Sequence, residues 1–149
     1  MVRTILLVDD DDDYLAIVKR AIQNEHLAAD VIVARSGTEA LERLGLLSGR
    51  AASPDKEFAV LFVDLNLPGV DGSEVLRRVR ADERLRRLPV VIVSSSSRAE
   101  DVTRCYDLGA NSYVVKRFDS SGPGRYVARA MNYWLDLNRA PGSAAASAS

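Results

Sequence analysis

The feature that most constrains the fold is an uninterrupted apolar stretch, residues 58–63, that ends in a single carboxylate, Asp64. Such a stretch, rich in aromatic and β-branched side chains, predicts a strand buried on both faces, as in the centre of a parallel sheet. Pro68 and Gly69 then turn the chain. Because ligands of open α/β sheets bind beyond the carboxyl ends of the strands, Asp64 is the candidate reactive group. Taken alone, Asp64 is also explained by capping of the helix that follows or by hydrogen bonds to loop amides.

A second apolar run, residues 4–8, also ends in acids, because five aspartates occupy positions 9–13. The last three suit the start of a helix, where negative charge is favourable with the helix dipole. Asp9 and Asp10 lie at the strand end itself. Together with Asp64 they offer hard oxygen ligands from two strand ends, which predicts a Mg²⁺ site. A solvated acidic loop remains the alternative.

The rest of the chain alternates short apolar runs with amphipathic stretches. Further strands are expected at residues 31–34, 89–93 and 112–115, and helices near 15–22, 37–47, 73–81, 99–108 and 122–137. This alternation predicts an α/β fold of the flavodoxin-like class, a doubly wound five-stranded parallel sheet with strand order 2-1-3-4-5. Residues 1–139 form one domain in this interpretation, residues 48–57 a surface insertion, and residues 140–149 a disordered low-complexity tail.

Polar groups follow two more of the predicted strands, Ser94 after the fourth and Lys116 after the fifth. In a parallel sheet all of these strand ends face one crevice. A carboxylate nucleophile, a metal held by acids, a hydroxyl and an ammonium group are the parts that phosphoryl transfer onto an aspartate requires. The alternative for Lys116, as for any lone lysine at a strand end, is a role as a surface salt-bridge partner.

Composition excludes several classes of protein. The 149 residues carry a formal net charge of −1, which gives no reason to expect a nucleic-acid partner, and the arginine-rich segment 77–87 is interpreted as a solvated helix face. A single cysteine, Cys105, excludes an intramolecular disulfide and is interpreted as helix packing. No apolar stretch reaches membrane-spanning length, and the start lacks a signal-peptide pattern. We therefore expect a cytoplasmic protein without a membrane partner.

Four motifs in order give the chain a family resemblance over residues 3–138. They are Val8-Asp9-Asp10, Val63 to Pro68 with Asp71-Gly72, Pro89 to Ser95, and Gly109-Ala110 with Tyr113 to Lys116. In these motifs the chain resembles a CheY-like response-regulator receiver domain of two-component signalling. The resemblance implies that Asp64 accepts a phosphoryl group from the phosphohistidine of a histidine kinase.

The resemblance also implies roles for the neighbouring residues. Mg²⁺ would be held by Asp10, by Asp64 and by the Asn66 carbonyl, and Asp9 would support the ion through water. The phosphoryl oxygens would be bound by Ser94 and Lys116. The switch would be Ser94 with Tyr113, an aromatic residue that changes rotamer when the serine moves towards the phosphate.

Arg117 departs from the family pattern, because most receivers carry a proline after the lysine of the site. A cis bond without proline costs roughly 2.5 to 4 kcal/mol, so we expect Lys116-Arg117 to be trans. The insertion before the central strand, the run Asp64 to Pro68 and the aromatic end of the last helix are more similar to single-domain regulators of phytochrome-type kinases. The expected kinase partner is therefore a bacteriophytochrome.

Few residues follow Leu137, so we expect no output domain and a receiver that acts as a phosphorylation-controlled binding module. One alternative is an aspartyl-phosphate hydrolase. Dehalogenase-like phosphatases carry an acid two residues after the nucleophile, whereas here that position is Asn66, which favours slow self-dephosphorylation. The other alternative is a phosphate sink or a structural receiver-like protein that is never phosphorylated.

The predicted last helix is apolar over an arc of about 220°, wider than one sheet can cover. Its surplus apolar residues predict a homodimer through this helix, since interfaces favour aromatic side chains. The expected interface residues are Tyr126, Tyr133, Trp134 and Leu137. The alternatives are cover by the tail or by the 48–57 insertion, and contact with a partner kinase or an output protein.

Overall fold

The computed structural model describes residues 3–47, 57–117, 122 and 124–141. Its sheet consists of β1 (Arg3–Val8), β2 (Ala29–Ala34), β3 (Phe58–Asp64), β4 (Val90–Ser94) and β5 (Ser112–Val115). All of the strand pairs are parallel, and the order is β2-β1-β3-β4-β5. The predicted flavodoxin-like class and strand order are confirmed. The central strand β3 is buried along almost its whole length, as the apolar stretch predicted.

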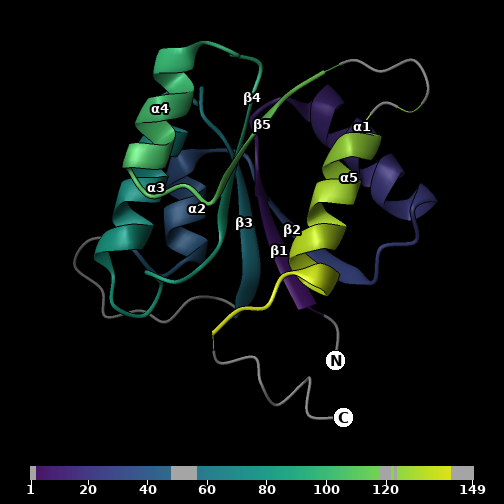
Figure 1. The fold of residues 1–149 in the computed structure, drawn as a ribbon, viewed down its shortest axis with the longest axis horizontal. Helices are drawn as coiled ribbons and strands as arrows, with labels where there is room; N and C mark the ends of the chain where they lie inside the picture. The colour runs from purple at the N-terminus through teal and green to yellow at the C-terminus, as the bar shows by residue number, and fades with distance from the viewer. Residues whose placement is uncertain (1–2, 48–56, 118–121, 123, 142–149) are drawn as a thin grey trace.

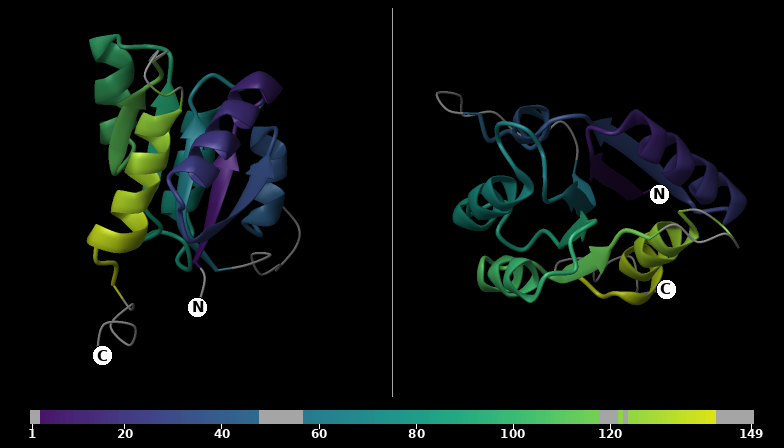
Figure 2. Two further views of the ribbon diagram at one scale, coloured as in Figure 1. Left: turned by 90° about the vertical axis from the view of Figure 1, so that its right-hand side faces the viewer. Right: turned by 90° about the horizontal axis from the view of Figure 1, so that it is seen from above.

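Helices cover both faces of the sheet (Figure 1). They are α1 (Asp12–Asn24), α2 (Gly37–Arg43), α3 (Gly72–Ala81), α4 (Ala99–Asp107), α5 (Arg125–Asn132) and a π-helical turn, η1 (Tyr133–Leu137). The core on one face is filled from α2, α3 and α4, and the core on the other face from α1 and α5. Helices α1 and α5, far apart in sequence, lie side by side (Figure 2).

The acidic run after β1 starts helix α1. The Asp11 carboxylate is the N-cap and accepts hydrogen bonds from the amides of Asp13 and Tyr14 at 3.0 and 3.2 Å. Asp12 and Asp13 occupy the first turn, where they complement the helix dipole. Asp71 caps α3 in the same way through the amide of Glu74, so the capping role considered for Asp64 falls to another residue.

Two helices differ from the prediction. Helix α2 ends at Arg43 rather than at Leu47, because Gly45 takes a left-handed conformation, φ 73°, that stops a helix. The last helix begins at Arg125, after Gly124 in the left-handed region, and its α-helical part ends at Asn132. Beyond Asn132 the helix widens into the π-helical turn, which the regular apolar spacing did not predict.

The prediction of a solvated arginine face is wrong for Arg80. Its guanidinium is half-buried and donates hydrogen bonds to the carbonyls of Gly109 and Leu88 at 2.9 and 2.7 Å, and to the Asn111 side chain at 2.6 Å. Asn111 in turn accepts from the amide of Val90, at the start of β4. Arg80 therefore joins the end of α3 to the turn before β5. The predicted packing role of Cys105 agrees with its 1% exposure.

Most of the predicted insertion and of the predicted tail, residues 48–56 and 142–149, lies outside the described residues.

Candidate functional site

The register of the sheet brings the predicted site residues to one edge. Val8 pairs with Val63, so the next residues along the two strands, Asp9 and Asp64, are neighbours. Ser94 pairs with Val115, so Lys116 follows directly beside it. The site therefore follows from strand order and register, as the convergence of polar strand ends predicted.

Lys116 stands between the two buried carboxylates. Its Nζ lies 2.8 Å from Asp9 Oδ2 and 3.2 Å from Asp64 Oδ2. Both acids are almost inaccessible, with 1% and 7% of their surface exposed. Lys116 is thus no surface salt-bridge partner but the cation of a buried cluster, in which each negative charge needs a partner.

Burial and neighbouring charges shift the pKa of Asp64 and of Lys116. Burial raises the pKa of Asp64, Lys116 opposes this, and the nearby Asp9 raises it again, so that the net pKa lies above the usual value. Burial alone would lower the pKa of Lys116, but its bonds with Asp9 and Asp64 outweigh burial and raise it. One ammonium group shared by two carboxylates leaves the cluster short of positive charge.

The acids of the cluster fit a divalent metal ion. Asp9, Asp10 and Asp64 each offer a carboxylate oxygen, and these oxygens lie within 4.8 Å of one another. Asp10 is exposed and the other two are buried, so an ion here would keep an open side towards solvent. That arrangement suits a hard divalent cation, which is bound by carboxylate oxygens together with waters.

Asn66 and Ser94 complete the edge of the site. The Asn66 amide N–H donates to Asp64 Oδ1 at 3.2 Å, and Asn66 Nδ2 lies 3.5 Å from Ser94 Oγ. Ser94 is fully buried, and its hydroxyl oxygen also accepts a hydrogen bond from the Ser96 amide at 3.1 Å. The proposed metal ligand on Asn66, its carbonyl oxygen, stays a prediction.

The predicted switch residue Tyr113 contacts the loop after β4. Its side chain is half-buried, and its hydroxyl donates to the Ser96 carbonyl at 2.8 Å. Because Ser96 also binds Ser94, the serine of the site and the tyrosine are joined through a single residue. The rotamer change itself stays a prediction.

Sequence reasoning missed Tyr14, which lies against the lysine of the site. Lys116 Nζ is 4.2 Å from the centre of the Tyr14 ring. The Tyr14 hydroxyl lies 3.2 Å from the Tyr126 hydroxyl, and Tyr126 accepts a hydrogen bond from the amide of Arg117 at 3.2 Å. An aromatic residue on the buried face of a helix is typical of a core position, so its spacing in the sequence gives no signal for this contact. The Lys116-Arg117 bond is trans, as predicted.

The predicted interface residues are not all exposed on the surface. Tyr133 is 47% and Leu137 72% exposed, as expected. The expected exposure of Tyr126 is wrong, because the residue is half-buried and bonded to Tyr14. Trp134 is also half-buried and makes an edge-to-face contact with Tyr133, the ring centres being 5.1 Å apart. Their role in dimerisation stays a prediction.

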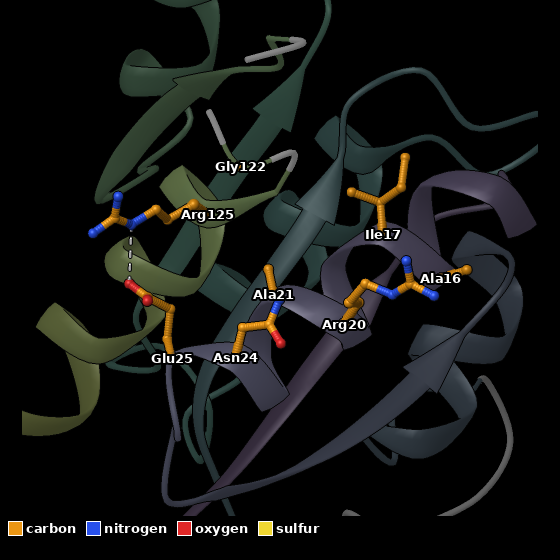
Figure 3. Close-up of a pocket in the computed structure, with 8 residues that line it drawn as sticks. All are labelled: Ala16, Ile17, Arg20, Ala21, Asn24, Glu25, Gly122 and Arg125. Carbon is orange, nitrogen blue, oxygen red and sulfur yellow. Dashed lines mark hydrogen bonds and ion pairs between the residues drawn. The ribbon is translucent and has the colours of Figure 1, made fainter. Parts of the chain in front are cut away.

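The structure also contains a hollow of about 560 Å³ between α1 and the start of α5, away from the aspartate cluster (Figure 3). Its walls include Ile17, Arg20, Glu25 and Arg125. The Glu25 carboxylate lies 3.4 Å from the guanidinium of Arg125, and Figure 3 marks this ion pair with a dashed line. None of the aspartates of the cluster lines this hollow, so the chemistry belongs to the sheet edge.

Within the described part of the chain, each helix is too short or too polar to span a membrane.

Comparison with known proteins gives a consistent family. The model of the response regulator receiver domain matches residues 5–122. Among characterised relatives, the probable methanogenesis regulatory protein FilR2 of Methanothrix harundinacea is 36% identical over 140 residues, which cover 94% of this chain and 88% of that protein.

Solved structures agree in fold and sequence. The phosphorylated cyanobacterial phytochrome response regulator RcpA is 31% identical with a TM-score of 0.80, over 95% of this chain and 100% of that chain. The Mn²⁺-bound form of response regulator Rcp1 is 28% identical with a TM-score of 0.80, over 94% of this chain and 99% of that chain. The bacteriophytochrome response regulator AtBRR is 38% identical with a TM-score of 0.71, over 94% and 96%. From the matched family model and these relatives, the chain belongs to the response-regulator receiver family.

Proposed function

We propose that this protein is a phosphoryl acceptor of two-component signalling, in which Asp64 takes a phosphoryl group from the phosphohistidine of a histidine kinase. The observation that carries the proposal is the shared ion pair of Lys116 with Asp9 and Asp64, next to the exposed Asp10. A nucleophilic carboxylate, acids for a metal and a fixed ammonium group are thus assembled at one place. Phosphoryl transfer needs chiefly such positioning and charge neutralisation.

The reaction forms a bond between an Asp64 oxygen and phosphorus while the bond from phosphorus to the histidine nitrogen breaks. The nitrogen keeps the electron pair of the broken bond. Mg²⁺ would be held by Asp10, Asp64 and the Asn66 carbonyl, with Asp9 supporting it through water. The ion would supply positive charge for the transferred phosphoryl group. Lys116 supplies further positive charge from within the cluster, because its Nζ already contacts Asp64.

Release of the phosphoryl group should be slow. Dehalogenase-like hydrolases carry an acid two residues after the nucleophile, whereas here that position is Asn66, whose side-chain amide faces Ser94. The protein then acts as a switch rather than as an enzyme with turnover. In the switch, Ser94 moves to a phosphoryl oxygen, and Tyr113 leaves its bond to the Ser96 carbonyl.

The partner kinase in this proposal is a bacteriophytochrome. Support comes from similarity to RcpA and AtBRR over nearly the whole chain. We place the switch in a cytoplasmic protein whose receiver domain spans residues 1–139, with no nucleic-acid or membrane partner. Its output would be contact with another protein, including a second copy of the chain through the last helix.

Incubation with acetyl phosphate and Mg²⁺, followed by intact-mass measurement, tests the proposal. The expected result is one added phosphoryl group that depends on Mg²⁺ and is absent from Asp64→Asn. An unchanged wild-type mass, or an addition that persists in Asp64→Asn, contradicts it. A product that is lost at once with steady release of phosphate favours the hydrolase.

The kinase assignment has a separate test, phosphotransfer from a panel of purified histidine kinases. A bacteriophytochrome should transfer faster than kinases of chemotaxis or nutrient sensing. Preference for another kinase overturns the partner but leaves the phosphoryl acceptor in place.

A further inference from the structure

The lysine of the site is enclosed on three sides. Two of these are the Asp9 and Asp64 carboxylates, and the third is the ring of Tyr14, whose centre lies 4.2 Å from Nζ. This distance falls within the range of cation–π attraction, which is strongest when the pair is shielded from water. Tyr14 is 7% exposed and the Lys116 side chain 14%, so the contact is well shielded.

The ring is itself held in place from helix α5. The hydroxyls of Tyr14 and Tyr126 lie 3.2 Å apart, and the amide of Arg117 donates to the Tyr126 hydroxyl. Arg117 follows Lys116 directly, so the contacts close a loop that returns to the lysine. A proline at position 117 has no N–H and could not close this loop. The departure from the family pattern at Arg117 thus supplies the donor.

Tyr14 remains a neutral phenol in this environment. Burial, and next the hydrogen bond with Tyr126, raise the pKa of its hydroxyl. A neutral ring attracts the ammonium group through its face and adds no third negative charge to the carboxylate cluster.

We propose that Tyr14 is a positioning residue for Lys116, with Tyr126 as its anchor. The ring holds the ammonium group where it meets the transferred phosphoryl oxygens. This inference rests on the proposed function, because the reaction it serves is phosphorylation of Asp64. Without the ring, the flexible lysine side chain samples more rotamers, and fewer of its conformations suit the reaction.

The kinetic test compares Tyr14→Leu and Tyr14→Phe with the wild type. Phosphorylation by acetyl phosphate at fixed Mg²⁺ is followed by intact mass over time. Tyr14→Leu should react roughly tenfold more slowly, the effect of losing a shielded cation–π contact. Tyr14→Phe keeps the ring and should recover most of the rate, within about threefold of the wild type, since only a neutral hydrogen bond is lost.

A matched control separates positioning from stability. Val18→Ala removes buried volume from the same helix and leaves the Tyr14 ring in place, so it should lower the unfolding midpoint but keep the wild-type rate. Mg²⁺ affinity should stay unchanged in Tyr14→Leu, because the ring is no metal ligand. A folded Tyr14→Leu protein with the wild-type rate overturns the inference. An unreactive wild type overturns the proposed function and, with it, the inference.

A spectroscopic measurement tests the contact between the Tyr14 ring and Lys116 even if Tyr14→Leu does not fold. The chain has three lysines, Lys19, Lys56 and Lys116, so lysine-selective ¹³C labelling gives few side-chain signals, and Lys116→Arg identifies the one of interest. The ring should shift the Lys116 ε-proton signal upfield of the other two in the wild type and in Tyr14→Phe. A Lys116 signal without this shift in the wild type overturns the contact, whatever the phosphorylation result.

Discussion

At the scale of single residues, the position of the Asp64 carboxylate lowers the stability of the fold, and the proposed function explains why this residue is there. It is buried next to Asp9, and the two carboxylates share one ammonium group. Like charges at short distance destabilise each other, and burial together with the neighbouring Asp9 raises the pKa of Asp64. A metal ion or a bound cationic partner would reduce the repulsion between the two carboxylates. The cluster is therefore poised to bind positive charge.

Removal of the Asp64 charge should stabilise the metal-free protein. We expect Asp64→Asn to raise the free energy of unfolding by roughly 1 kcal/mol at pH 7, measured by urea denaturation in the presence of a chelator. Lys116 keeps its contact with Asp9 in this variant.

The pH dependence of this effect follows from the direction of the pKa shift. The folded wild type holds the Asp64 proton more tightly than the unfolded chain, so its stability falls as pH rises from the usual aspartate value, 3.8, through the raised folded pKa. The gain in the free energy of unfolding of Asp64→Asn over the wild type should thus vanish in acid and grow towards neutral pH. Saturating Mg²⁺ should stabilise the wild type more than the variant. An Asp64→Asn protein less stable than the wild type across this range contradicts the account.

Lys116→Ala should separate metal binding from phosphorylation. The variant keeps Asp9, Asp10 and Asp64, so we expect Mg²⁺ binding to persist, measured by calorimetry. Phosphorylation by acetyl phosphate should slow by about 10²-fold or more, as for loss of a charged group at the reacting atoms. Ser94→Ala serves as comparison, since it should impair mainly the switch. A Lys116→Ala protein that reacts like the wild type would return this lysine to the role of a structural ion-pair partner.

At the scale of elements, one arginine fixes the end of α3. The Arg80 guanidinium donates to three carbonyls, those of Gly109, Leu88 and Arg86, and to the Asn111 side chain, at distances from 2.6 to 3.2 Å. Arg80→Ala should lower the free energy of unfolding by roughly 1–3 kcal/mol, because partners of a half-buried charged group lose their donor. Arg77→Ala is the matched control on the same helix. Its exposed pair with Glu74 should contribute less than about 0.5 kcal/mol in the same denaturation measurement. Equal effects of the two substitutions would contradict the assigned role of Arg80.

The sequence predicts those elements whose cause is local. The apolar stretch before Asp64 identified the central strand, and the acids after β1 identified the start of α1, because burial and capping act on neighbouring residues. The hydrogen bonds of Arg80 reach distant segments, and the π-helical turn after Asn132 contacts β3 and accepts a hydrogen bond from Arg3. Their residues fit an ordinary amphipathic helix equally well, so spacing could not distinguish them.

At the scale of the whole molecule, topology explains why the site could be predicted although its details could not. Parallel strands with right-handed crossovers bring their carboxyl ends to one edge, so polar residues after β1, β3, β4 and β5 had to converge. The contact between Tyr14 and Lys116 instead depends on how α1 lies on the sheet. Nothing in the local sequence fixes that orientation.

The exposed end of the last helix supports the proposal of self-association. Tyr133 and Leu137 remain accessible there, whereas Tyr126 is held within the chain. Wild type should sediment as a dimer at micromolar concentration and Tyr133→Glu as a monomer, because a buried unpaired charge opposes association. Tyr106→Glu is the matched control, an equally exposed tyrosine on α4, and should remain dimeric. A monomeric wild type refutes self-association, and dissociation only by Tyr106→Glu moves the interface to α4.

The central claim, that Asp64 carries the phosphoryl group, has a direct chemical test. Borohydride reduces an acyl phosphate to the alcohol, so the phosphorylated aspartate is converted to homoserine and can be located by peptide mass spectrometry. After treatment with acetyl phosphate and Mg²⁺, the account predicts homoserine at position 64 and unchanged aspartates at positions 9 and 10. Homoserine at position 9 or 10, or none in the protein, would contradict it.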